Sequence, residues 1–122
     1  MYQRGDIVLV PFPFTDLTST KRRPALVISN DLVNNTGDLI IVMITSQDKK
    51  DFLQIEIDSA NITPNLPKKS YVRYHKITIV DSSLVVALIS KADETLLEQV
   101  KQKIHLLLEA EVNPAFAVTI AD

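Results

Sequence analysis

The sequence predicts a mainly β fold of the α+β kind, a small closed or half-closed antiparallel barrel followed by a C-terminal α-helix. Short runs rich in Val, Ile and Leu follow one another closely through the first three quarters of the chain, and apolar residues then recur at helical spacing. The length of 122 residues suits one domain with a single core. We expect the barrel and helix over residues 1–110 and a separate tail over residues 111–122.

The first strand is expected at Gly5–Val10, and Pro11 and Pro13 end it because proline lacks the amide hydrogen that a central ladder needs. The following segment contains turn-forming residues without a period, which is typical of a loop. Pro24 favours an extended backbone at Arg23, so this arginine should stand at the edge of the next strand.

Two runs that are apolar on both faces are expected to form the middle of the sheet. They are Ala25–Ser29 and Leu39–Thr45, joined by a turn over Asn34–Asp38 that contains Gly37. Apolar and polar residues alternate over Leu53–Asp58, which predicts a peripheral strand with one face in water.

The remaining strands precede Asp93, where the spacing of the apolar residues becomes helical. Strand regions are expected at Ser70–Tyr74 with Ile77–Val80 and at Leu84–Ile89, which makes about six strands in all. Beyond Asp93 a helix of about four turns is expected, with an apolar face formed by Leu96, Leu97, Val100, Ile104, Leu107 and Leu108. Asp93 and Glu94 suit its start. His105 lies away from the apolar face and is expected at the surface.

The composition argues against several classes of protein. The chain has no cysteine and two histidines, so a thiolate metal site is excluded and a zinc site is not expected. We therefore expect chemistry without a metal or other cofactor. No run approaches the ~18 apolar residues of a membrane span, and we expect a cytoplasmic protein.

The net charge of −2 does not favour a general polyanion binder, but the basic residues are clustered. One cluster is Lys21, Arg22 and Arg23, and the second is Lys68, Lys69, Arg73 and Lys76. This distribution fits a local phosphate site, although each cluster alone could equally be solvated surface charge.

Polar side chains at strand ends are the candidates for chemistry. The guanidinium of Arg23 would be held on a rigid edge, which suits bidentate phosphate binding. Thr45 and Ser46 follow the apolar run Leu39–Ile44 and place two hydroxyls at the end of a central strand. The alternative is that Arg23 caps the sheet and that the Thr-Ser pair satisfies its own turn.

A second group of candidates lies within SYVRYHK, where Ser70, Arg73, His75 and Lys76 follow one another. On a regular strand Arg73 and His75 project from the same face. A cation beside an imidazole could move protons near a phosphate, and Arg73 should lower the pKa of His75. Tyr71, Tyr74, Phe12 and Phe14 are candidates for stacking on bases. The alternatives are an exposed strand face for the charged residues and core packing for the two phenylalanines.

Four segments together resemble the MazF/PemK family of toxin endoribonucleases. They are RGDIVLVPFPF at residues 4–14, KRRPALVIS at residues 21–29, the strand end Ile44-Thr45-Ser46, and LPKKSYVRYHKI at residues 66–77. The likeness extends from about Arg4 to Leu108 and leaves only the tail uncovered.

The resemblance implies an SH3-like barrel, a symmetric homodimer and metal-independent cleavage of single-stranded RNA at short preferred sequences. It also implies a cognate antitoxin whose acidic segment would occupy the basic groove. Arg23, Thr45 with Ser46, and Arg73 match the positions of the family's catalytic residues. The RNA-binding residues would be Lys21, Arg22, Ser70 and Lys76. His75 stands where some members have the carboxylate of an Arg-x-Asp pair, and this departure leaves its proton-transfer role open.

The sequence also allows two other functions. A CcdB-type toxin uses the same kind of barrel to bind DNA gyrase through a C-terminal end that contains tryptophan, but this chain has no Trp and ends in Thr-Ile-Ala-Asp. The other is a family member that has lost catalysis and only binds RNA or a partner protein, which the histidine at position 75 would allow.

Overall fold

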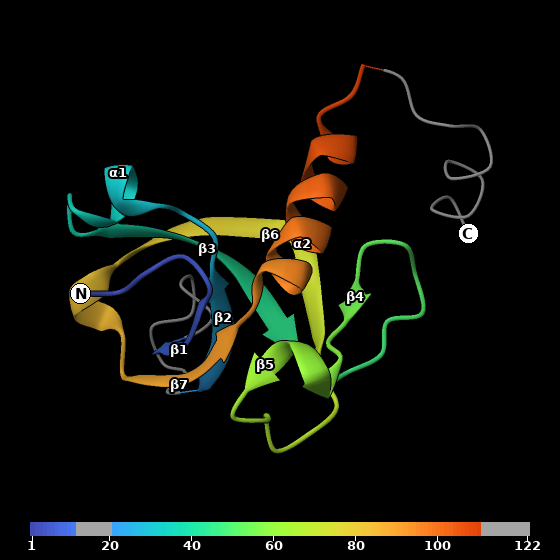
Figure 1. Cartoon of the computed structure of the whole chain (residues 1–122), viewed down its shortest axis with the longest axis horizontal. Coiled ribbons are helices and arrows are strands. Elements are labelled where there is room, and N and C mark those ends of the chain that lie inside the picture. The colour runs from blue at the N-terminus through green and yellow to red at the C-terminus, as the bar shows by residue number, and fades with distance from the viewer. Residues whose placement is uncertain (12–20, 111–122) are drawn as a thin grey trace.

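The structure is a computed structural model that describes residues 1–11 and 21–110 (Figure 1). In chain order its elements are β1 (Asp6–Pro11), β2 (Arg22–Val27), α1 (Asp31–Asn34), β3 (Asp38–Thr45), β4 (Ile55–Glu56), the 3₁₀ turn η1 (Ser59–Asn61), β5 (Ile62–Thr63), β6 (Tyr71–Asp81), the 3₁₀ turn η2 (Ser82–Leu84), β7 (Ala87–Ala92) and α2 (Glu94–Leu107).

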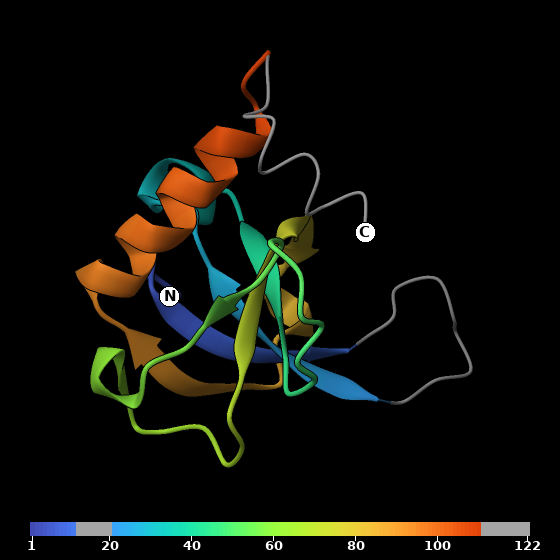
Figure 2. The same ribbon diagram turned by 90° about the vertical axis from the view of Figure 1, so that its right-hand side faces the viewer.

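The strands form one curled antiparallel sheet in the order β4-β6-β3-β2-β1-β7-β5. Helix α2 lies against one side of this sheet (Figures 1 and 2). The prediction of a small antiparallel barrel with a C-terminal helix is therefore confirmed.

The two faces of the sheet carry separate apolar clusters. The α2 side is packed with fully buried residues from the sheet and helix, including Ile7, Leu26, Val42, Ile44, Val72, Tyr74 and Leu96. A second cluster contains Val8, Val10, Ala25, Val27, Leu39, Ile41, Met43 and Val80. The central strands are buried on both faces, as their continuous apolar runs predict.

Helix α2 begins where the sequence predicts. Asp93 caps it by accepting a hydrogen bond from the Leu96 amide at 3.0 Å, and Asn61 donates to the other carboxylate oxygen at 2.9 Å. Leu96 and Leu97 are buried against the sheet, and His105 is exposed as expected.

Strand β2 begins earlier than predicted, because Arg22, Arg23 and Pro24 all pair with β1. The pairing with β3 starts only at Ala25, so Pro24 lies where β2 has a partner on one side only. A proline costs no ladder hydrogen bond at such a position, and the expected strand Ala25–Ser29 was therefore placed too late.

The link from β2 to β3 contains the short helix α1, which was not predicted. Asn30 caps it by accepting a hydrogen bond from the Leu32 amide at 3.0 Å. The expected turn follows, and Gly37 takes a φ of +95° there, a conformation that favours glycine.

The smaller strands differ from their predicted bounds. The alternating segment Leu53–Asp58 contributes only the two residues of β4, which lies at the edge of the sheet as expected. Strand β5 was missed because two residues leave no periodic pattern. Strand β7 starts at Ala87 rather than at Leu84, since η2 occupies Ser82–Leu84.

Strand β6 is continuous but contains a bulge where its pairing with β3 shifts. Val42 of β3 pairs with Ile77, whereas the next residue, Met43, pairs with Arg73. Tyr74, His75 and Lys76 therefore have no opposite residue on β3. His75 therefore lies within the bulge, two residues after Arg73.

Within the two described ranges, no helix is both long and apolar enough to cross a membrane. Phe12, Phe14 and the tail over residues 111–122 lie outside the described residues.

Candidate active site

The ends of three strands bring cations and a hydroxyl around one small cavity. Arg23 comes from β2, Thr45 from the end of β3, and Arg73 from β6. The cavity has a volume of about 170 Å³ and is called the cationic pocket here; it is lined by Arg23, Met43, Ile44, Thr45, Gln47, Lys49, Arg73 and Lys76. Four positive side chains beside a hydroxyl make an environment suited to an anion.

A larger cavity of about 570 Å³ shares Arg23 and Thr45 with the cationic pocket. We call it the apolar cleft; its lining is Leu9, Arg22, Arg23, Pro24, Ile44, Thr45, Ser46, Asn65, Leu66, Pro67, Lys68, Ser70 and Ile89. Its aliphatic side chains are bordered by Arg22 and Lys68. The two cavities together therefore offer apolar surface next to a cationic end.

The hydroxyl of Thr45 is held at the cationic pocket by its own turn. Its Oγ1 accepts a hydrogen bond from the Gln47 amide at 3.1 Å. A hydroxyl that accepts one hydrogen bond still has its own hydrogen to donate. The turn interpretation of the Thr-Ser pair is thus observed for Thr45 and is compatible with a ligand. Ser70 differs, because it is buried and its hydroxyl donates to the Lys68 carbonyl at 2.8 Å.

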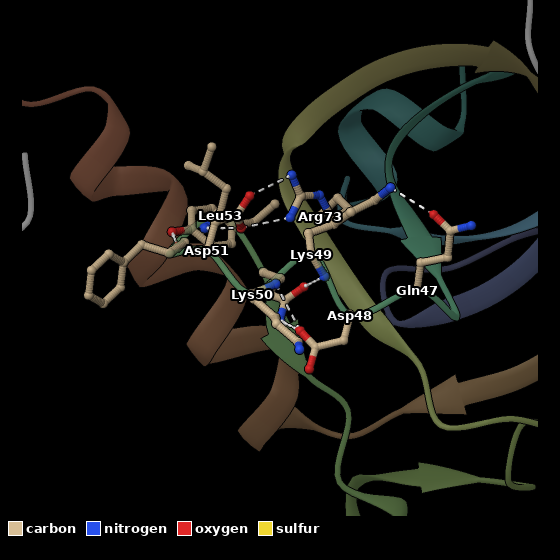
Figure 3. Close-up of polar contacts among 10 residues, drawn as sticks. Gln47, Asp48, Lys49, Lys50, Asp51, Leu53 and Arg73 are labelled. Atoms are coloured by element: carbon tan, nitrogen blue, oxygen red, sulfur yellow. Dashed lines mark hydrogen bonds and ion pairs between the residues drawn. The ribbon is translucent and has the colours of Figure 1, made fainter. Parts of the chain in front are cut away.

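Arg73 is buried and forms a bidentate ion pair with Asp51, which lies in the loop between β3 and β4 (Figure 3). Its Nη1 lies 2.8 Å from Asp51 Oδ1 and its Nη2 lies 3.2 Å from Oδ2. The hydrogen bond from Arg73 is the largest cause that lowers the pKa of Asp51, so this carboxylate is ionised at neutral pH. The Nε of Arg73 is buried and has no hydrogen-bond partner among the described residues.

His75 lies in the bulge and lines neither cavity. Burial lowers its pKa below 6.5, the positive charges of Arg73 and Lys76 lower it further, and Asp51 offsets part of the effect. The expected direction of the Arg73 effect is confirmed. The imidazole is therefore mainly neutral at pH 7, and its buried Nδ1 has no partner among the described residues.

The aromatic residues of β6 do not provide stacking surfaces. Tyr71 is 6 % exposed and Tyr74 is fully buried, with its hydroxyl donating to the Phe52 carbonyl. The prediction that these two tyrosines stack on bases is therefore wrong, because their rings are packed in the protein interior.

A family model described as PemK-like, MazF-like toxin of type II toxin-antitoxin system matches residues 3–108. The chain belongs to this family. The resemblance of the four sequence segments to MazF/PemK toxins is thereby confirmed. No curated protein in the comparison matches the chain.

Solved structures of MazF toxins share the fold. MazF in a MazE-MazF crystal structure (Form-III) from Deinococcus radiodurans is 25 % identical, with a TM-score of 0.71 over 88 % of this chain and 95 % of that one. An endoribonuclease in complex with its cognate antitoxin, from Mycobacterial species, is 17 % identical, with a TM-score of 0.72 over 93 % of this chain and all of the other.

The predicted site residues of this PemK/MazF family member fall into three groups. Arg23, Thr45, Arg73 and Lys76 meet at the cationic pocket, and Arg22, Ser46 and Ser70 line the adjoining apolar cleft with Arg23 and Thr45. His75 and Lys21 line neither cavity.

Sequence reasoning missed Asp51 and Lys49. Both lie in the polar segment SQDKKD, which carries no periodic or motif signal, and Asp51 is 22 residues from Arg73 along the chain. Within residues 1–11 and 21–110, no three His, Asp or Glu side chains are grouped so that they could hold a metal ion.

Proposed function

We propose that this protein is a metal-independent endoribonuclease that cuts single-stranded RNA at short preferred sequences. It acts as the toxin of a type II toxin-antitoxin module. The observation that carries the proposal is the convergence of Arg23, Thr45 and Arg73 on one cationic pocket. Donors fixed around an anion-sized cavity suit a phosphate whose charge increases during reaction.

The proposed reaction uses the substrate's own nucleophile. The ribose 2′-oxygen attacks the adjacent phosphorus as its proton leaves to a base, and the P–O5′ bond breaks as an acid gives that oxygen a proton. The products are a 2′,3′-cyclic phosphate and a 5′-hydroxyl. DNA lacks the 2′-hydroxyl and would stay intact.

The residues take roles that match their positions. Arg23 would donate hydrogen bonds to the phosphate oxygens, and the Thr45 hydroxyl would add one more. Arg73 and Lys76 would supply positive charge to the same pocket. His75 has a pKa below 6.5 and would accept the 2′-hydroxyl proton when RNA brings that group within reach.

The apolar cleft would receive the nucleotides beside the cut phosphate. Single-stranded RNA presents unstacked bases that pack on apolar side chains, while its phosphates favour cationic edges. Arg22, Ser70 and Lys68 line this cleft, and Lys21 precedes it on the chain, so these residues would bind RNA. Ser46 lines the cleft beside Thr45 and would be a further candidate for the reaction.

The proposed assembly is a cytoplasmic homodimer that binds a cognate antitoxin. The partner proposal is supported by the MazE-MazF structure from Deinococcus radiodurans, which is 25 % identical to this chain. An acidic antitoxin segment would fit the cationic pocket and exclude RNA from it.

A gyrase-binding toxin is less well supported, because the chain has no tryptophan and its family model is that of PemK-like and MazF-like toxins. An inactive RNA-binding member is the second candidate, and it rests on the histidine at position 75.

Incubation with a long RNA in EDTA tests these functions together. We expect cleavage with 2′,3′-cyclic phosphate and 5′-hydroxyl ends, and no cleavage of DNA of the same sequence. Activity that disappears in EDTA and returns with magnesium would contradict the mechanism. Binding without cleavage would favour the inactive member, and gyrase inhibition without RNA cleavage would favour the other alternative.

A further inference from the structure

The loop between β3 and β4 supplies a carboxylate to an arginine of β6. Asp51 and Arg73 make two hydrogen bonds of 2.8 Å and 3.2 Å in a fork-to-fork arrangement (Figure 3). The Arg73 side chain is 9 % exposed and that of Asp51 is 33 % exposed. Water therefore has little access to the guanidinium, and its orientation is set mainly by this partner.

The carboxylate is itself held in place. Asp51 Oδ1 also accepts a hydrogen bond from the Leu53 amide at 2.9 Å, which closes a tight turn. Tyr74 fixes the same segment by donating its hydroxyl to the Phe52 carbonyl. The segment Asp51–Leu53 is thus attached to β6 at two neighbouring positions, 73 and 74, where the bulge begins.

The ion pair uses two of the five N–H groups of the Arg73 guanidinium, one from Nη1 and one from Nη2. The buried Nε has no partner in the described part of the chain. Arg73 lines the cationic pocket with Arg23 and Thr45. The bidentate ion pair with Asp51 therefore fixes a positive charge at the wall of that pocket.

We propose that Asp51 is a positioning residue of the RNA-cleaving site and that it acts by holding the Arg73 guanidinium beside Arg23 and Thr45. The proposal rests on the proposed function. Asp51 itself does not line the cationic pocket, so its effect on the reaction passes through Arg73. A small misplacement of a group at the reacting phosphate is enough to slow the reaction strongly.

The first experiment replaces the carboxylate and separates kcat from KM. Asp51→Asn keeps the size of the side chain but loses its charge and one acceptor, and we expect kcat to fall by about 10²-fold with little change in KM. Asp51→Glu keeps the charge and should restore part of the loss. Asp48→Asn is the matched control, because Asp48 lies in the same loop and bonds Lys50 and Gln54 instead of Arg73. It should cleave RNA at close to the wild-type rate.

The second experiment tests whether Asp51 acts through Arg73. Arg73→Lys keeps the positive charge but cannot form the fork. If Asp51 only positions Arg73, adding Asp51→Asn to Arg73→Lys should cause little further loss of kcat. Losses that multiply in the double variant would overturn the proposal, and so would wild-type kcat in Asp51→Asn.

Thermal melting distinguishes a positioning role from a folding role. The Asp51→Asn and Asp51→Glu chains should be folded at the assay temperature, and an unfolded Asp51→Asn chain would overturn the proposal in favour of a structural role. The failures of the two proposals are distinguishable. A wild-type chain that cuts no RNA removes the proposed function and this inference together, whereas an active wild type with an equally active Asp51→Asn removes the inference alone.

Discussion

Arg73 of β6 lies opposite Met43 of β3, while the residue before Met43, Val42, lies opposite Ile77. The extra residues of β6 are Tyr74, His75 and Lys76, which form the bulge, and Lys76 lines the cationic pocket. Bulges often occur beside active sites because they redirect a side chain without interrupting the sheet. Here the bulge allows Arg73 and Lys76 to line one cavity although they are not two residues apart on a regular strand.

Arg23→Ala should remove at least ~2.7 kcal/mol of transition-state stabilisation, the scale expected for one preorganised donor to a developing anion. The half-buried Arg23 lies at the junction of the two cavities, so the fold should melt normally without it. Single-turnover cleavage of a short RNA measures the effect. Arg4→Ala is the control, because Arg4 makes an exposed ion pair with Glu94 at 2.8 Å. Equal activity of the two variants would show that Arg23 does not contribute to cleavage.

Thr45→Val tests the hydroxyl at nearly constant shape. A hydrogen bond to a charged group contributes about 1.5–3 kcal/mol, so cleavage should slow by roughly tenfold or more. Thr45→Ser keeps the hydroxyl and should retain most of the activity. Thr78→Val changes a threonine of β6 that lines neither cavity and should have little effect on cleavage. If Thr45→Val cleaves as fast as Thr45→Ser, the hydroxyl does not contribute.

His75→Gln tests proton transfer through the pH profile. The pKa of His75 is lowered below 6.5, chiefly by burial, so the neutral base form prevails at pH 7. This form is lost as pH falls through the lowered pKa. The cleavage rate should therefore fall on the acid side of pH 6.5. The glutamine variant should lose this limb and cleave ~10² to 10⁴ times more slowly. An unchanged limb in the variant would limit His75 to binding phosphate.

The same histidine links pH to stability. Its folded pKa lies below its unfolded pKa near 6.5, so the unfolded chain binds more protons in acid. Above pH 6.5 this histidine contributes nothing to the pH dependence of stability. As pH falls below 6.5, the difference in its protonation between the two states destabilises the fold. Urea titrations between pH 7 and 5 should show a smaller loss of stability for His75→Gln than for the wild type.

The homodimer is tested by sedimentation equilibrium at micromolar concentration. We expect twice the mass of one chain, because a two-fold axis would extend the short cleft of one protomer into a longer groove for RNA. The active Asp48→Asn control should show the same mass. A monomer that still cleaves RNA at full rate would show that cleavage does not require the dimer.

The sequence predicts the order of the major elements because each depends on local patterns. The apolar run Leu39–Thr45 and the helical period after Asp93 are visible without knowledge of the fold, and the structure confirms both. Arg23 and Thr45 were found because each follows or precedes a recognisable strand. The structure places both residues at one pocket, and their catalytic roles remain predictions.

Other features depend on contacts between distant segments. The bulge in β6 is set by its pairing with β3, and the two-residue strands exist because a neighbouring strand provides their hydrogen bonds. The ion pair of Asp51 with Arg73 requires the loop after β3 to turn back onto β6. Neither residue type nor spacing along the chain indicates such a contact in advance.

The buried residues of α2 are all in its first half. Leu96, Leu97 and Val100 are buried and Asp93 is held by Asn61, whereas Leu108 at the C-terminal cap is 78 % exposed. The free energy of local opening should therefore decrease along the helix. Amide hydrogen exchange would reveal a gradient, with protection near Val100 approaching that of the sheet and the last turn exchanging through fraying. The last turn can thus unwind while the barrel and its cavities stay folded.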